Sequence, residues 1–176
     1  MKYLFPLLIS VVLIACGGAK FSKAHKPDYT VVADDHAKVL KGYINRSIIE
    51  NDSAFHWFKE NMKWGQADAS AIQAFSVNKN KFSMLVFGGT WCGDTKNLWP
   101  VFYRLVDKSG YPESKITLVG VDREKTTVDD LHKKWNIVNV PTFIVLHDGK
   151  EVGRVVEYGK LNQIDKELGE IVASIK

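Results

Sequence analysis

Residues 82–96 read FSMLVFGGTWCGDTK, an apolar run followed by a glycine-containing turn, a cysteine and a polar segment. The run from Phe82 to Phe87 has the length and apolar character of a buried strand, and the polar segment favours a helix. A cysteine at such a strand-to-helix turn lies near free backbone N–H groups, which stabilise a thiolate. The stretch therefore predicts a strand, a turn and a helix that together display Cys92 as a nucleophile.

The position three residues after Cys92 is occupied by Thr95 rather than by a second cysteine. The chain thus has the attacking residue of a Cys-x-x-Cys site without its resolving partner. The sequence contains only two cysteines, Cys16 and Cys92. If Cys16 carries a lipid, Cys92 has no partner for an intramolecular disulfide, and an exported chain with one free thiol is unusual.

The chain after residue 82 follows a regular pattern of helices and strands. We expect a helix over 91–109 that is interrupted at Pro100, then a strand over 116–121 and a short helix over 127–135 that Thr127 caps. Two strands follow over 142–146 and 151–157, joined by a turn at Asp148-Gly149, and a helix over 161–175 ends the pattern. With the first strand, the order β-α-β-α-β-β-α predicts a mixed sheet with helices on both faces.

The region before residue 82 is less regular. Residues 39–49 fit a short strand or an irregular packed segment, and helix start signals follow at residues 51–53 and 68–70. The aromatic residues of segment 55–64 recur at near-helical spacing. We interpret them as core, and a surface for a partner remains the alternative.

Four features in order and spacing resemble the thioredoxin superfamily: Trp91-Cys92-Gly93-x-x-Lys96 after a strand, Pro100 eight residues after the cysteine, Val140-Pro141-Thr142 before an apolar strand, and Asp148-Gly149 after it. The resemblance implies an α/β fold, a thioredoxin-like mixed sheet flanked by helices, here with an N-terminal extension. It also implies that Pro141 is cis beside the active sulfur, and that backbone next to it, at Val140, pairs with a substrate chain.

The resemblance also assigns roles around the cysteine. Trp91 is expected to shield the sulfur, Gly93 to permit the turn, and the Thr95 hydroxyl to hydrogen-bond the thiolate. Val86 stands where thioredoxins carry a buried acid that assists the resolving cysteine. Together with Thr95, it indicates that the chain is not an ordinary dithiol reductase.

The N-terminus is typical of an exported lipoprotein. Lys2 precedes an apolar stretch that ends in Leu13-Ile14-Ala15-Cys16, which resembles the bacterial lipobox. We expect a signal peptide over 1–15, lipid on Cys16, a flexible tether over 16–36, a packed N-terminal extension over 37–81 and a thioredoxin-like domain over 82–176. The protein would then sit in the cell envelope, anchored by lipid and facing the periplasm; a plain signal peptide is the alternative.

Two functions from different classes fit these residues. The first is monothiol thiol–disulfide exchange through Cys92, with protein or small-molecule thiols and disulfides as partners and with an external thiol or partner oxidoreductase for resolution. The second is a redox-inactive thioredoxin-like binding module. Neither needs a cofactor. A peroxidase is disfavoured, since peroxiredoxins have T-x-x-C and this chain has C-x-x-T.

Composition and spacing argue against several other functions. The net charge is +4 with scattered basic residues, so nucleic-acid binding is not expected. The five histidines show no paired ligand spacing, so no metal site is expected. The loop 122–125 reads as a solvated surface at a strand end, although partner contact is open there. Arg154 and Glu157 read as exposed pairs on a strand.

Overall fold

The computed structural model describes residues 24–176. The predicted signal peptide 1–15, the lipid site Cys16 and the first residues of the predicted tether lie outside the described residues. In the described part of the chain, no helix is both long enough and apolar enough to cross a membrane.

A six-stranded mixed sheet forms the centre of the fold, in the order β1-β2-β4-β3-β5-β6. Its strands are β1 (Asp28–Val32), β2 (Val39–Ile44), β3 (Phe82–Gly88), β4 (Ile116–Gly120), β5 (Thr142–His147) and β6 (Lys150–Val156). β3 and β4 are parallel and every other neighbouring pair is antiparallel. The expected α/β fold with a mixed, helix-flanked sheet is therefore confirmed.

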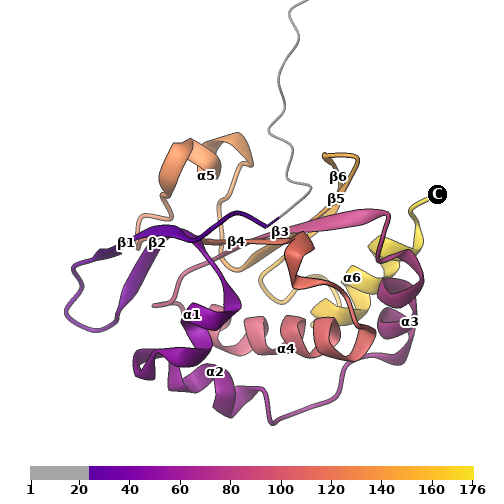
Figure 1. Cartoon of the computed structure of the whole chain (residues 1–176), viewed down its shortest axis with the longest axis horizontal. Coiled ribbons are helices and arrows are strands. Elements are labelled where there is room, and N and C mark those ends of the chain that lie inside the picture. Colours follow the sequence, from indigo (N-terminus) through magenta and orange to yellow (C-terminus); the bar gives the residue numbers. More distant parts are fainter. Residues whose placement is uncertain (1–23) are drawn as a thin grey trace, which may run out of the picture.

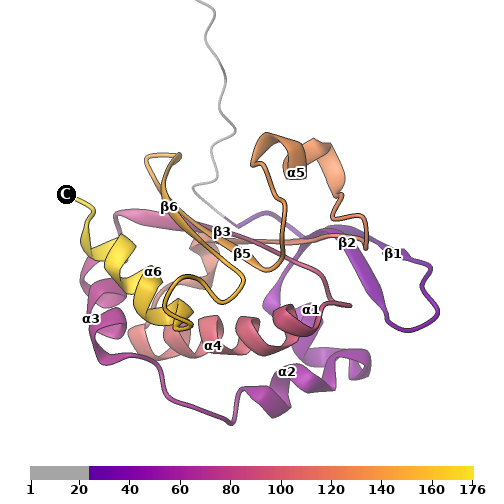
Figure 2. The ribbon, with the colours of Figure 1, turned by 180° about the vertical axis from the view of Figure 1, so that it is seen from behind.

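Helices cover the two faces of the sheet unequally (Figures 1 and 2). One face carries α1 (Arg46–Asn51), α2 (His56–Asn61), α3 (Ala69–Asn78), α4 (Gly93–Ser109) and α6 (Ile164–Ala173), and the other carries α5 (Leu131–Lys134). Single 3₁₀ turns lie at 53–55, 113–115 and 128–130. Each face has its own apolar cluster, the larger around Trp99 and Phe102 and the smaller around Phe87 and Leu131. The end of β3, and with it Cys92, is thus held between two packed layers.

The N-terminal segment belongs to the sheet itself. β1 lies inside the predicted tether 16–36 and pairs with β2 along its whole length, from Asp28 opposite Tyr43 to Val32 opposite Val39. β2 in turn pairs with β4, so the predicted extension 37–81 adds a strand to the sheet. The tether prediction missed β1 because most of its residues are exposed and backbone pairing leaves no apolar pattern in the sequence.

The segment 39–64 is partly as expected. The strand ends at Ile44, and α1 follows from Asn45, whose side chain accepts a hydrogen bond from the Ile48 N–H. Phe55, Trp57 and Phe58 are buried, which confirms the core interpretation for these three. Trp64 departs from it, because 71% of its surface is exposed.

Thr127 does not cap the helix that it precedes. Its hydroxyl donates a hydrogen bond to the Gly120 carbonyl at 2.8 Å, and its side chain does not cap the turn that follows. The predicted cap is therefore wrong. The hydroxyl instead ties the loop after β4 back to the end of that strand.

Gly120 allows β2 to lie close to β4. A methyl group on Gly120 would overlap the backbone carbonyl oxygen of Leu40, which cannot move without shifting β2. We expect Gly120→Ala to lower the free energy of unfolding by about 3 kcal/mol, the upper part of the range for overpacking. Urea unfolding followed by tryptophan fluorescence measures the change.

Gly93→Ala is the matched control for this substitution, because a methyl group on Gly93 would meet no atom within 4 Å. Equal urea midpoints for Gly120→Ala and Gly93→Ala would show that β2 does not approach β4 this closely.

Candidate functional site

Cys92 lies at the turn between β3 and α4. It occupies the N-cap position of α4 with extended backbone, φ −80° and ψ 130°. Its N–H donates to the Gly89 carbonyl at 2.9 Å, and its carbonyl accepts the first helical hydrogen bond, from the Lys96 N–H, at 3.1 Å. The side chain is half-buried and the thiol is free. The local geometry expected from the sequence is therefore present.

The sulfur of Cys92 faces the loop before β5. Its thiol donates a hydrogen bond to the Val140 carbonyl at 3.4 Å. The Val140–Pro141 peptide bond is cis, and both residues are buried. The structure thus brings Cys92 together with Val140 and Pro141, which follow it by 48 positions or more.

Thr95 is fully buried one turn into α4. Its hydroxyl oxygen accepts a hydrogen bond from the Gly89 N–H at 3.2 Å. Within the described residues, no hydrogen bond joins the Thr95 hydroxyl to the Cys92 sulfur, so the predicted one is absent. Thr95 therefore fixes the turn that carries Cys92 and contacts the backbone rather than the sulfur.

Trp91 is half-buried beside the cysteine. Its indole N–H donates to the Val121 carbonyl at 3.1 Å, and the ring lies flat against Gly89, where a methyl group would come within 2.6 Å of it. The Arg123 guanidinium lies over the ring, 5.3 Å from its centre, which is a cation–π contact. Trp91 is therefore held in one orientation at the edge of the site.

Arg123 is itself fixed by a residue of the N-terminal segment. The Asp34 carboxylate accepts hydrogen bonds from Arg123 Nε and, at 3.0 Å, from Arg123 Nη2. It also accepts from the N–H groups of His36 and Ala37 at 2.9 Å. The Arg123 guanidinium, aided by these N–H groups, holds the pKa of the Asp34 carboxyl well below its usual range.

This link was not found from the sequence. Asp34 falls in the predicted tether, and Arg123 falls in a loop interpreted as a solvated surface. The two lie 89 positions apart, and nothing local in either segment indicates that they meet. The loop between β1 and β2 is therefore a structural part of the region around Trp91.

Asp34→Asn tests this link through the pH dependence of stability. Because the folded-state pKa of Asp34 is depressed, its ionised form stabilises the fold above the unfolded pKa of about 3.9, and this contribution is lost as the pH falls below that value. We expect Asp34→Asn to unfold at a lower urea concentration than the wild type at pH 7. The difference between their urea midpoints should narrow as the solution is acidified.

Asp35→Asn serves as the control for this measurement, since Asp35 is an exposed neighbour on the same loop. A gap between wild type and Asp34→Asn that stays constant from pH 7 to strongly acidic solution would contradict the ion pair.

Gly93 and Val86 complete the predicted residues around the sulfur. Gly93 has no positive φ and faces open space, so the turn does not require a glycine there, contrary to the predicted role. Gly93 is instead exposed on the first turn of α4, next to Cys92. Val86 is fully buried in the middle of β3, so the position assigned to a buried acid holds an aliphatic side chain.

Glu157 lies beside Pro141, where the sequence predicted an exposed pair with Arg154. The Glu157 N–H donates to the Pro141 carbonyl at 2.8 Å, and its carboxylate accepts from the Asn139 side chain at 3.3 Å. Arg154 pairs with Glu151 instead, with Nε 2.6 Å from Oε1. Glu157 and Asn139 therefore border the cis-proline loop and were missed as residues near the site.

The described residues contain no group of three His, Cys, Asp or Glu side chains placed to hold a metal ion. The chemistry available at this site is that of one half-buried thiol, a facing backbone carbonyl and a cis-proline. A thiolate there can attack a disulfide sulfur and form a mixed disulfide.

Comparison with known proteins is consistent with this geometry. The Thioredoxin family profile matches residues 68–170, a range that starts before the predicted domain boundary at residue 82. A thioredoxin H-type of Picea mariana is 29% identical over 99 residues, covering 56% of this chain and 74% of that protein. The TPR repeat-containing thioredoxin of Arabidopsis thaliana is 35% identical over 86 residues, covering 48% of this chain and only 21% of that protein.

Among solved structures, a protein of unknown function from Pseudomonas aeruginosa superposes with a TM-score of 0.53 at 15% identity, covering 74% of this chain and 92% of that one. At that identity the likeness concerns the fold alone.

Proposed function

The chain belongs to the thioredoxin family, and from this premise we propose that it carries out monothiol thiol–disulfide exchange through Cys92. The observation that carries the proposal is the position of the Cys92 thiol at the start of α4, 3.4 Å from the Val140 carbonyl and next to the cis Val140–Pro141 bond. The missing second cysteine sets the mechanism, because Thr95 cannot displace a bound substrate.

The proposed reaction has two exchange steps. The Cys92 thiolate attacks one sulfur of a disulfide R–S–S–R′, which forms a Cys92–S–S–R bond and releases R′–S⁻. An external thiolate R″–S⁻ then attacks the sulfur of R, which forms R–S–S–R″ and returns Cys92 to its thiolate. One disulfide enters and one leaves, so the cycle needs a second thiol and no cofactor.

Residues around Cys92 would position the substrate for this exchange. Thr95 holds the turn through Gly89, so that the sulfur stays aimed at the loop before β5. Trp91, held in one orientation next to Cys92, would shield one side of the sulfur, and the open space at Gly93 would leave room for a substrate. A substrate strand would run along the Val140–Pro141 segment and pair with its backbone beside the sulfur.

We also propose that the protein acts from the cell envelope. The lipobox-like Leu13-Ile14-Ala15-Cys16 supports removal of residues 1–15 and lipid attachment to Cys16. The folded part would then face the periplasm, joined to the lipid by the residues that precede β1. Its partners would be protein or small-molecule thiols and disulfides, and an external thiol or partner oxidoreductase would resolve the intermediate.

Glutathione disulfide is a direct probe of the first step. The full chain carrying Cys16→Ser has one thiol, so any adduct seen by mass spectrometry lies on Cys92. We expect one glutathione adduct per folded chain, which reduced glutathione then removes. A folded chain that stays unmodified, while the same chain in urea is modified, would overturn the proposal.

A further inference from the structure

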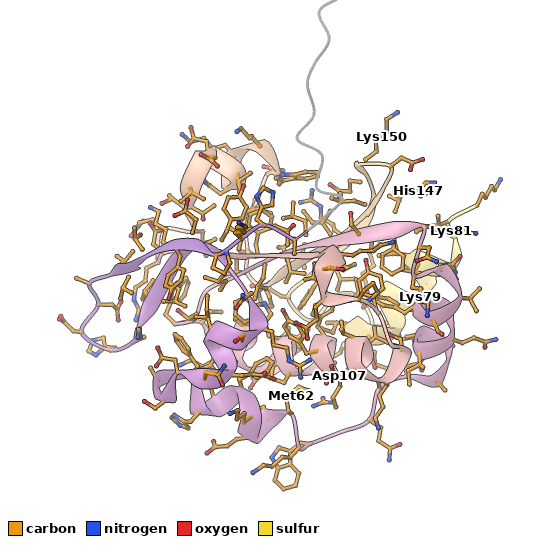
Figure 3. The ribbon with its side chains drawn as sticks, in the orientation of Figure 1. Met62, Lys79, Lys81, Asp107, His147 and Lys150 are labelled. Atoms are coloured by element: carbon orange, nitrogen blue, oxygen red, sulfur yellow. The ribbon has the colours of Figure 1, made fainter. Side chains whose placement is uncertain are left out.

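Basic side chains gather at the end of the molecule opposite Cys92. Figure 3 shows Lys79, Lys81, His147 and Lys150 along this end, and Lys115 reaches into the same group, with Nζ donating to the Lys79 carbonyl at 2.9 Å. Lys81 immediately precedes β3, whereas Cys92 follows the far end of that strand. We call these five residues the basic end.

The positive charge of the basic end is not neutralised locally. In the described part of the chain, none of its four lysines forms an ion pair with a carboxylate. Asp148 lies within the group, 3.6 Å from His147 Nε2, and has 88% of its side chain exposed. The four lysines are therefore left without a paired carboxylate in the described part of the chain, because the neighbouring Glu113 and Glu151 pair with Arg46 and Arg154.

A hollow lies within the basic end. Its volume is about 390 Å³, and it is lined by Asn80, Lys81, Phe82, Ser83, Lys115, Leu146, Asp148 and Gly149. Lys81, Lys115 and Ser83 in this lining suit a phosphate group, and the two lysines outnumber the one carboxylate, Asp148. The hollow thus matches the charge of the surface around it.

The described chain begins beside this same group. The Ala24 N–H donates to the Ser114 carbonyl at 2.7 Å, and Ser114 is the neighbour of Lys115. Cys16 lies eight residues before Ala24, which an extended chain spans in at most about 29 Å. Lys20 and Lys23 fall between them and add two positive charges. A lipid on Cys16 would therefore keep the basic end near the bilayer.

We propose that the basic end is a membrane-docking face that binds the phosphate groups of anionic phospholipids. The inference rests on the lipid anchor of the proposed function and goes beyond it, because it fixes how the domain stands on the membrane. Lysines within a Debye length of an anionic surface, about 8 Å, are drawn to it. The Cys92 end then points away from the bilayer, toward partners in the aqueous phase.

Lysine acetylation in proteoliposomes tests the docking face. The lipidated protein is placed in vesicles of phosphatidylcholine alone or with phosphatidylglycerol, and the rate at each lysine is read by mass spectrometry. We expect Lys79, Lys81 and Lys150 to react roughly threefold or more slowly in the anionic vesicles. Lys59 and Lys63, exposed at α2 and just after it, serve as internal controls and should react equally in both.

A charge reversal within the basic end sharpens the test. Lys81→Glu with Lys150→Glu should abolish the slowing at Lys79, whereas the matched pair Lys59→Glu with Lys63→Glu should preserve it. A Cys92 alkylation rate equal to that of the wild type, measured on the same samples, shows that each variant keeps its folded site. Loss of slowing in both double variants would overturn the assignment of the face to these lysines.

Three other results would also overturn the docking face. Equal acetylation rates of the basic-end lysines in neutral and anionic vesicles would show that this face does not dock, even if the lipid anchor holds the protein on the membrane. If inorganic phosphate slowed the acetylation of these lysines in neutral vesicles, the hollow would bind a soluble anion rather than a lipid headgroup. A chain that binds neither kind of vesicle would contradict both the lipid anchor and the docking face. The glutathione adduct on Cys92 would still test thiol exchange separately.

Discussion

We expect Cys92→Ser to lower the rate of the proposed thiol–disulfide exchange by on the order of a thousandfold or more, because a serine hydroxyl cannot replace a thiolate as nucleophile. The substitution is nearly isosteric, and the serine O–H can still donate to the Val140 carbonyl that accepts from the thiol. Stability should therefore change little. The measurement is the release of the coloured thiol from an aromatic disulfide, beside urea unfolding of the same samples.

Cys16→Ser is the matched control, since it removes the other cysteine and keeps Cys92. Exchange that persists in Cys92→Ser would contradict the assignment of the nucleophile. If neither the wild type nor Cys92→Ser exchanged disulfides, and both bound the same partner equally, the chain would be the redox-inactive binding module.

Thr95→Cys should convert the site into one that resolves its own mixed disulfide. Residues three apart on a helix are neighbours, which places a cysteine at 95 within reach of the Cys92 sulfur. An intramolecular thiol acts at high effective concentration, so we expect release of a Cys92-bound thiol to accelerate by on the order of a hundredfold or more. Single-turnover release, with a loss of two hydrogens from the protein mass, reports the step.

Thr95→Ser is the control for this variant, because it retains a hydroxyl for the Gly89 N–H and adds no thiol. The cysteine variant gives up that hydrogen bond and should lose about 1 kcal/mol of stability. A Cys92-bound thiol that Thr95→Cys releases no faster than Thr95→Ser would show that the turn does not bring residue 95 to the sulfur.

The elements that carry Cys92 could be predicted from the sequence because their signals are local. β3 is a fully buried run that is apolar except for Ser83, and α4 begins at the turn that the glycines mark. β1 was missed since its residues are mostly exposed and its stability comes from backbone pairing with a distant segment. Local patterns report burial, and they do not report which exposed strands pair.

The candidate site could likewise be predicted in part. Cys92 and Pro141 were expected to meet, and the structure places them together. Asp34 and Glu157 were not connected with the site, because each reaches it through contacts across the fold, with Arg123 and with the Pro141 carbonyl. Whether the predicted site residues act in catalysis stays a prediction, which the Cys92 and Thr95 variants test.

The pairing of β1 with β2 also determines how the domain responds to a mechanical force. The chain enters β1 at Asp28, opposite Tyr43, and β2 continues into the rest of the fold just beyond Tyr43. A force that pulls on the N-terminus therefore acts on β1 at the same end of the hairpin at which β2 is held by the rest of the fold. The hydrogen bonds between the two strands then break one after another rather than all at once. Tension would peel β1 from Asp28 toward Val32 and then reach Asp34, releasing Arg123 from its carboxylate. Stretching of the N-terminal segment would thus loosen the support of Trp91 before it disturbs the core.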